Sequence, residues 1–247
     1  QCLDSNNIKT HSIVTNAKRK NGHWQITFSH HNKEFKIEAN NLILALPPRM
    51  ITTHLNAKEW ASTELFSALQ QVPTWMAAQA KFIATYKQPF WREQGLSGQV
   101  FSQQGPMQEM HDASADDSPP YALFGFIGLP ASYRRKFSTA QIEQACLAQL
   151  RKLYGEQATQ TESTYLKDWA TDEYSTSELD IKEPPKHPYF AIEPHDNELK
   201  SKHIYLAASE FSDTDAGYLE GAVCAISKVI ADIKINLGTD HEDSSRL

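Results

Sequence analysis

Residues 204–223 hold the pattern that decides the fold, and they read IYLAASEFSDTDAGYLEGAV. The run opens as a buried β-strand and continues through a polar turn into a helix, which we predict from about Gly217 to Lys234. The first turn of a helix offers free N–H groups and the positive end of its dipole, which favour an anionic or electron-rich ligand. Gly217 and Gly221 would let such a ligand approach the backbone. The alternative is an ordinary capped helix whose small residues allow tight packing.

A second apolar run lies nearer the N-terminus, where residues 41–49 read NLILALPPR. Because both faces of the run are apolar, it predicts a buried central strand, which Pro47 and Pro48 end. Residues 8–46 as a whole predict a β-meander that feeds this strand, with a turn at Asn21-Gly22. The same reasoning predicts helices over residues 57–71 and 139–154, β-like segments over 75–86 and 121–129, and a polar, proline-rich surface excursion over 171–200.

The composition excludes several classes of protein. The 247 residues include 24 basic and 30 acidic side chains, for a net charge of −6, and no dense basic stripe indicates a nucleic-acid partner. The longest apolar stretch, residues 42–48, is far shorter than the ~20 residues of a membrane helix, so no membrane partner is expected. The three cysteines, Cys2, Cys146 and Cys224, have neither disulfide nor metal-ligand spacing, which favours a cytoplasmic protein without a metal.

Glycine is scarce, with ten residues in the chain, and no two glycines are separated by a single residue. A G-x-G-x-x-G loop is therefore absent, as are the P-loop pattern and the G-x-S-x-G elbow. The sequence thus contains no complete dinucleotide-binding βαβ start of its own.

Lys81 is the most unusual residue of an otherwise apolar predicted strand, since it lies between Ala80 and Phe82. It could hold a water molecule against a cofactor atom, or it could simply point to solvent from a sheet that is covered on one side. Trp169 is either a core residue or an aromatic wall of a site, and its spacing alone does not decide between the two.

Five strings, in order and at matching spacing over roughly residues 8–232, together resemble the flavin-dependent monoamine oxidase family. They are residues 41–49, 80–92, 168–175, 206–210 and 217–222. The resemblance implies a mixed α/β and α+β fold, with an incomplete Rossmann-like FAD domain and a substrate domain built on a mixed sheet with helices. It also implies that the nucleotide-binding βαβ unit of the family lies N-terminal to everything in this chain, which would make the chain a truncated form.

The resemblance implies a division of the chain into domains. The expected parts are FAD-domain strands in residues 1–50, the substrate domain in 51–200, the last FAD-domain strand and flavin-facing helix in 201–235, and a flexible tail in 236–247.

The resemblance assigns two catalytic residues. Lys81 would hold a water near flavin N5, and Tyr218 would form one wall of an aromatic cage, where the ring attracts an amine nitrogen. Further residues would contact the cofactor: Ala45 and Pro47 beside the flavin, Trp169 against its ring, Ser209 and Glu210 near the ribityl and phosphate region, Gly217 at the helix start, and the Leu219 N–H at an isoalloxazine carbonyl.

Two positions depart from the family pattern. Glu178 lies where covalently flavinylated members have a cysteine, so we expect non-covalent FAD. Leu179 lies where the next aromatic residue is expected, so the second cage wall is missing or comes from elsewhere, with Tyr189 or Phe190 as candidates. Because the adenine-diphosphate half of the site is missing, this chain is expected to bind flavin weakly or not at all.

The implied reaction transfers a hydride from a carbon next to nitrogen to flavin N5. The imine product would hydrolyse, and O2 would be the electron acceptor, giving peroxide. The expected partner is a small amine, while the oligomeric state stays open. The alternatives are a flavin oxidase or desaturase acting on C–C or dihydropyridine substrates, a non-enzymatic binding module, and a folded fragment without a function of its own.

Overall fold

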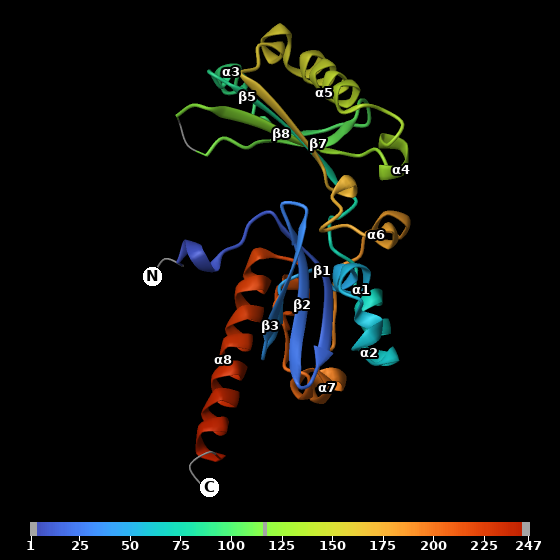
Figure 1. Cartoon of the computed structure of the whole chain (residues 1–247). Coiled ribbons are helices and arrows are strands. Elements are labelled where there is room, and N and C mark those ends of the chain that lie inside the picture. The colour runs from blue at the N-terminus through green and yellow to red at the C-terminus, as the bar shows by residue number, and fades with distance from the viewer. Residues whose placement is uncertain (1–3, 116–117, 244–247) are drawn as a thin grey trace. The chain divides into compact units, whose positions relative to one another are not determined.

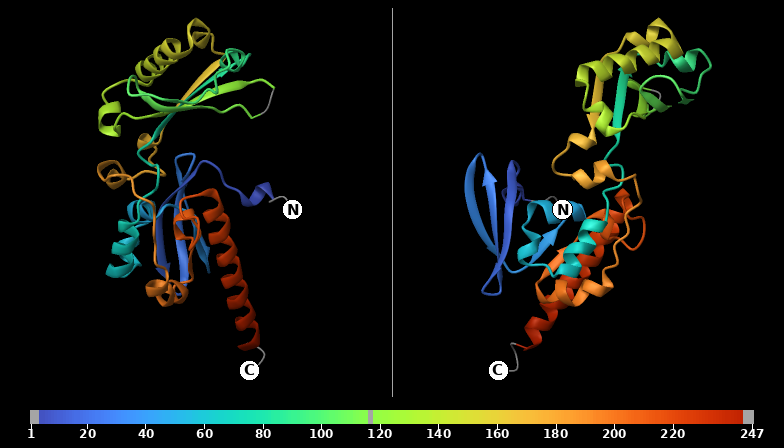
Figure 2. Two further views of the ribbon diagram at one scale, coloured as in Figure 1. Left: turned by 180° about the vertical axis from the view of Figure 1, so that it is seen from behind. Right: turned by 90° about the vertical axis from the view of Figure 1, so that its right-hand side faces the viewer.

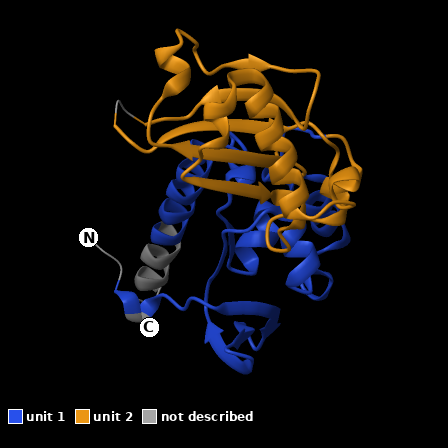
Figure 3. Ribbon diagram, turned by 90° about the horizontal axis from the view of Figure 1, so that it is seen from above, with its two compact units in different colours: residues 1–75, 185–247 blue, residues 76–184 orange. Residues whose placement is uncertain are grey.

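The computed structural model describes residues 4–115 and 118–243. The chain forms two compact units (Figure 3): unit 1 comprises residues 1–75 and 185–247, and unit 2 comprises residues 76–184. Helices and sheets occur in both units, which confirms the mixed α/β fold class. We expected breaks after residues 50 and 200, whereas the units divide after residues 75 and 184.

The N-terminal part of unit 1 is the expected β-meander (Figure 1). Strands β1 (Ser12–Lys20), β2 (His23–His30) and β3 (Lys33–Ala39) pair antiparallel in sequence order. The β1–β2 turn has positive φ at Asn21 (52°) and Gly22 (84°), as a two-residue hairpin requires.

The layer behind the meander is a parallel pair of short strands. Strand β4 (Leu42–Leu44) pairs with β10 (Ile204–Leu206), and Leu44 and Leu206 are partners in the register. One side of the pair joins a core with Trp24 and α2, and the other side packs against α8 (Leu219–Asp243). Figure 2 shows the meander and α8 on opposite sides of unit 1.

Strand β4 is not the buried central strand that we predicted. In the described part of the chain it pairs with β10 alone, and Ile43 is 46% exposed.

The helices of unit 1 differ from the predicted pattern in three ways. The helix expected over residues 57–71 is interrupted, because α2 (Thr63–Gln71) has its N-cap at Ser62, whose Oγ accepts the Leu65 N–H at 3.1 Å. Residues 185–200 are not only a surface excursion, since Phe190 and Leu199 are buried in the unit 1 core. Helix α8 ends at Asp243 rather than near residue 234, so the tail expected over 236–247 is helical as far as the structure describes it. The remaining α-helices of this unit are α1 (Pro48–His54) and α7 (Asp196–Ser201).

Unit 2 is a five-stranded antiparallel sheet with one face covered by a helix (Figures 1 and 3). The strand order is β6–β7–β8–β5–β9. The bounds are β5 (Ala80–Tyr86), β6 (Val100–Phe101), β7 (Met107–Asp112), β8 (Tyr121–Ile127) and β9 (Ser163–Asp168). Helix α5 (Thr139–Tyr154) packs its apolar side on the sheet. The strand expected from residue 75 begins only at Ala80 because residues 75–78 form a turn.

Local chemistry sets the start of α5. Ser138 and Gln141 form a capping box, in which each side chain satisfies an N–H group of the other residue. Short helices complete unit 2: α3 (Phe90–Glu93), α4 (Ala131–Arg134) and α6 (Glu178–Lys182). Of the helices in the described residues, none is long and apolar enough to cross a membrane.

The described residues also include six 3₁₀ segments: Ser5–Asn7, Ala57–Glu59, Glu156–Thr159, Trp169–Thr171, Glu193–His195 and Ser209–Phe211.

Candidate active site

Two predicted cofactor segments leave the same edge of the β4–β10 pair in unit 1. The strands are parallel, and the Ala207 N–H donates to the Leu44 carbonyl at 2.9 Å. Their carboxyl ends therefore coincide, which is where open α/β sheets bind ligands. Residues 45–47 and 208–210 continue from this edge, and the Ser209 hydroxyl donates to the buried Glu210 carboxylate at 2.9 Å.

Helix α8 begins beside the same edge because a glycine allows a close backbone contact. A Cβ at Gly221 would lie 2.3 Å from the Asp215 carbonyl oxygen and 3.2 Å from that of Ser209. Gly217 adopts φ 84°, which favours glycine. Leu219 is 90% exposed, so the first turn of the helix is accessible from outside. Accessible helical N–H groups and small side chains fit the electron-rich edge of a flavin.

Tyr218 has two aromatic neighbours that the sequence did not indicate. Its ring centroid lies 4.7 Å from that of Trp75 and 5.5 Å from that of His187, and Trp75 and His187 are themselves 4.7 Å apart. Both neighbours are distant from Tyr218 along the chain, so no local pattern could have connected them.

Tyr189 and Phe190, the two candidates for the second cage wall, differ in their exposure to solvent. Phe190 is buried and packs edge-on against Phe211, while Tyr189 is 82% exposed. Among the described residues, the Trp75 and His187 rings pack against Tyr218, and the assignment of Tyr189 or Phe190 to the second cage wall stays a prediction.

In unit 2, Lys81 lies on the open face of the sheet, opposite the face that α5 covers. Along β5 the residues alternate, and Ala80, Phe82, Ala84 and Tyr86 are buried in the core with α5. Lys81 is half-buried, and its Nζ lies 5.3 Å from the ring centroid of Phe126 and 6.0 Å from that of Phe124. Within the described residues the Lys81 side chain makes no hydrogen bond or ion pair, and its charged group contacts only these rings. The side chain is thus neither a plain solvent-facing lysine nor one that is neutralised by a carboxylate.

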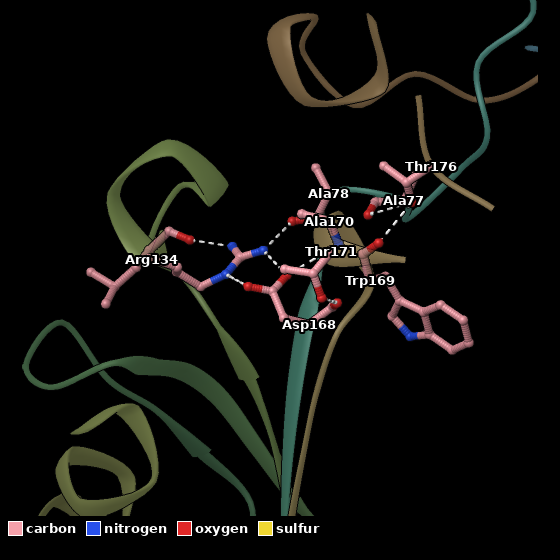
Figure 4. A network of polar contacts seen from close by, with 9 residues as sticks. Ala77, Ala78, Arg134, Asp168, Trp169, Ala170, Thr171 and Thr176 are labelled. Atoms are coloured by element: carbon pink, nitrogen blue, oxygen red, sulfur yellow. Dashed lines mark hydrogen bonds and ion pairs between the residues drawn. The ribbon is translucent and has the colours of Figure 1, made fainter. Parts of the chain in front are cut away.

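A buried ion pair fixes the turn that presents Trp169 (Figure 4). Arg134 donates to both carboxylate oxygens of Asp168 at 2.8 and 2.6 Å and to the Ala78 carbonyl at 2.8 Å. Its side chain is only 2% exposed. Asp168 also accepts the Ala170 N–H at 3.1 Å, so the arginine connects three segments of unit 2.

The Trp169 backbone is held on both sides by this arrangement. Its N–H donates to the Gln79 carbonyl at 3.0 Å, and its own carbonyl accepts the Thr176 hydroxyl at 2.8 Å. The indole ring points away from the network (Figure 4) and is 37% exposed, with the Lys167 Nζ 4.5 Å from its centroid. Trp169 is therefore an accessible aromatic surface on a rigid turn rather than a core residue. No local sequence pattern indicated the supporting role of Arg134.

The position expected for covalent attachment carries a surface carboxylate. Glu178 pairs with Arg135 at 3.5 Å and with Lys182 at 3.9 Å. In the part of the chain that the structure describes, no group of three or more His, Cys, Asp or Glu side chains could hold a metal ion.

Known proteins resemble this chain in sequence and in fold. A family model described as flavin containing amine oxidoreductase matches residues 3–225. The protein called AofH in Mycobacterium tuberculosis, whose name assigns it to the flavin-containing monoamine oxidases, is 28% identical over 204 residues, covering 79% of this chain and 42% of AofH. Putrescine oxidase of Kocuria rosea is 32% identical over 104 residues, which are 38% of this chain and 20% of that protein.

A solved structure shows the shared fold. Cyclohexylamine oxidase from Brevibacterium oxydans superimposes with a TM-score of 0.70 at 22% identity, over 91% of this chain and 48% of that chain. The chain spans less than half the length of these proteins. The match over residues 3–225 confirms the resemblance found in the sequence motifs, and the chain belongs to the flavin-containing amine oxidoreductase family.

Proposed function

We propose that the protein acts as an FAD-dependent oxidoreductase that oxidises the C–N bond of a small amine, with O2 as electron acceptor. The observation that carries this proposal is Lys81, an ammonium group without a carboxylate partner in the described residues, on a sheet face where its neighbours are phenylalanine rings. Overall, the amine gives up two electrons and two protons to become an imine, and O2 takes them up as peroxide. The scattered cysteines support a cytoplasmic setting.

Residues of unit 1 would hold the cofactor without a covalent bond. FAD supplies the two-electron acceptor when it is bound. The Leu219 N–H would donate a hydrogen bond to FAD from the first turn of α8. Ala45, Pro47 and Gly217 would leave room for the cofactor to lie close to the backbone. Ser209 and Glu210 would lie toward its ribityl and phosphate part. Glu178 supports non-covalent binding, because a carboxylate cannot form the thioether that a cysteine forms.

Three side chains would act on the reacting groups. The Lys81 ammonium would donate a hydrogen bond that fixes a water molecule, and it can do so because no carboxylate in the described residues engages it. The exposed ring of Trp169 would pack against the cofactor. Tyr218 would present its ring to the amine nitrogen, which the negative face of the ring attracts.

Replacing Lys81 tests this proposal. With FAD supplied in large excess, so that the weakly binding chain is loaded, Lys81→Met should lower the rate of amine-dependent peroxide formation by roughly 100-fold, the size typical of losing a positioned proton donor. The matched control is Lys87→Met, because the Lys87 side chain is 82% exposed just beyond the end of the same strand, and its rate should be unchanged. Full activity of the Lys81→Met variant would show that Lys81 takes no part in the reaction.

The cofactor requires its own measurement. We propose that this chain by itself binds FAD weakly, because it lacks a G-x-G-x-x-G loop for the pyrophosphate. The visible absorption of the purified chain should therefore show no flavin band, and a strong band would contradict this part of the proposal.

One observation favours a second candidate function. In the family pattern Leu179 takes the place of an aromatic cage residue, and it is 40% exposed on α6, so this wall of the cage offers no aromatic ring to an amine nitrogen. The candidate is a flavin oxidase or desaturase acting on C–C or dihydropyridine substrates. A peroxide assay across amines and dihydronicotinamides distinguishes the two, since an inactive amine panel would eliminate the amine oxidase.

A further inference from the structure

A hollow of about 670 Å³ lies in unit 2 at the end of β5 that is opposite to the Lys81 end. This volume is within the range of ligand pockets in proteins, about 300–1,000 Å³. The hollow opens between the end of β5 and the segment that leads into β9, and its lining consists of three glutamines, a threonine, a lysine, a glutamate and two aromatic residues. None of these residues has a part in the proposed oxidation.

Two hydrogen bonds hold the walls of this hollow together. The Tyr86 hydroxyl donates to the Ala158 carbonyl at 3.0 Å, and the Glu162 N–H donates to the Thr85 carbonyl at 2.8 Å. Tyr86 and Phe90 are buried, and their ring centroids lie 5.1 Å apart, so the base of the hollow is apolar and closely packed. The hollow is therefore formed before a ligand binds, which lowers the entropic cost of binding.

The polar side chains of the lining keep hydrogen-bonding capacity for a ligand. The amides of Gln88 and Gln160 and the hydroxyl of Thr161 make no hydrogen bond in the part of the chain that the structure describes. The Gln157 amide engages its oxygen, which accepts the Gln94 Nε2–H at 3.2 Å, and its own NH2 group stays available. Each uncommitted amide offers donors as well as an acceptor.

The charge and chemistry of the lining exclude several classes of ligand. The Lys87 Nζ lies 4.0 Å from the Glu162 Oε1 at the rim, so the two charges offset each other and the hollow favours neither an anion nor a cation. A wholly apolar ligand would displace water from the amides and leave them without partners, which costs free energy. The lining has no histidine or cysteine, the side chains that most often bind transition metals. These exclusions leave a neutral molecule with several donors and acceptors.

We propose that this hollow binds a neutral polyhydroxyl molecule of the size of a hexose, at a site separate from the oxidation chemistry. An amide can donate to one hydroxyl and accept from the next, so two adjacent hydroxyls of a sugar match one glutamine side chain. The apolar base suits the C–H face of a sugar ring, because aromatic faces carry partial negative charge and attract polarised C–H groups. The simplest alternative is a surface hollow filled with water, which would show no saturable binding.

NMR titration of the chain itself, without cofactor, tests the site. The side-chain NH2 resonances of Gln88, Gln157 and Gln160 should shift saturably with D-glucose, with a Kd in the millimolar range that is expected for a small polar ligand. Cyclohexanol has a ring of the same size and one hydroxyl, and it should bind about tenfold more weakly because it leaves most of the amides unpaired. Glucose 6-phosphate should bind no more tightly than glucose, since the hollow has no net charge to attract the phosphate.

A variant of the lining locates the hydrogen bonds. Gln160→Ala should weaken glucose binding about fivefold, because it removes an amide that has no protein partner to retain, and the exposed position leaves the fold intact. The matched control is Gln144→Ala, which removes an exposed amide of α5 outside the hollow and should have no effect. The inference would be overturned by an absence of saturable shifts, by cyclohexanol binding as tightly as glucose, by tighter binding of the phosphate ester, or by a Gln160→Ala variant that binds glucose like the wild type.

Discussion

At the scale of single residues, Asp112 shows how opposing effects on one carboxyl group are resolved. Burial by itself would raise the pKa of Asp112, but hydrogen bonds from Arg92, Ser114 and Trp91 outweigh it and hold the pKa well below its usual range. Because the pKa is lower in the folded state than in the unfolded state, the carboxylate stabilises the fold fully above the unfolded pKa of about 3.9. This stabilisation is lost as the pH falls from there toward the folded pKa.

The Asp112→Asn variant tests this account. At pH 7 it should lose about 2 kcal/mol of unfolding free energy, since it gives up charged hydrogen bonds to three partners. Below about pH 4 the wild type loses the same contribution, so the two proteins should converge in urea unfolding followed by tryptophan fluorescence. The exposed Glu156→Gln variant should show neither effect. A constant difference between Asp112→Asn and wild type at pH 7 and pH 3 would refute the assignment.

At the scale of elements, the start of α8 depends on Gly221. In an unconstrained helix, alanine is about 1 kcal/mol better than glycine. Here the added Cβ would lie 2.3 Å from the Asp215 carbonyl oxygen, a backbone atom that cannot rotate away. Gly221→Ala should therefore destabilise the protein by about 1–3 kcal/mol instead of stabilising it.

Thermal unfolding and hydrogen exchange of residues 209–221 would measure this loss. Glu220→Ala is the control, since Glu220 is exposed in the same helical turn and its replacement should change the stability by less than 1 kcal/mol. A Gly221→Ala variant more stable than wild type would show that the close contact with Asp215 is absent in solution.

At the scale of the whole molecule, the chain has a separate hydrophobic core in each unit. Leu65 is fully buried in the core of unit 1, and Leu150 is 1% exposed in the core of unit 2. Unit 1 is built from two distant parts of the chain, which Trp24 joins by donating its indole N–H to the Lys202 carbonyl at 2.8 Å. The Ser62 hydroxyl adds a second connection by donating to Glu198 at 2.6 Å.

Two leucine truncations, each the control of the other, test this organisation. Leu65→Ala and Leu150→Ala should each cost about 2–5 kcal/mol, because each leaves a cavity in a packed core. In hydrogen-exchange mass spectrometry, Leu65→Ala should accelerate exchange in β2 and leave β5 unchanged, while Leu150→Ala should do the reverse. Acceleration across both units by either variant would mean that the two cores unfold as one.

The sequence by itself determined the features that neighbouring residues encode. The Asn21-Gly22 turn, the three strands of the meander, the helix that Ser138 caps and the five family motifs all depend on local chemistry. The motifs also identified Lys81 and Tyr218, whose catalytic roles stay predictions. The expected helix over residues 57–71 failed for an equally local reason, because the Ser62 cap starts a new helix inside it.

Only the tertiary structure decided which distant segments meet. Residues far apart in the chain meet in the pairing of β4 with β10, in the Trp75 and His187 rings beside Tyr218, in the ion pair of Arg134 with Asp168, and in the placement of Lys81 beside Phe126. Forming such contacts costs the entropy of closing long loops. They form only where the free energy gained by packing the whole unit exceeds that cost. A short pattern of residues does not show whether packing outweighs the entropy of loop closure. The candidate residues could therefore be named from the sequence, but their neighbours in space could not.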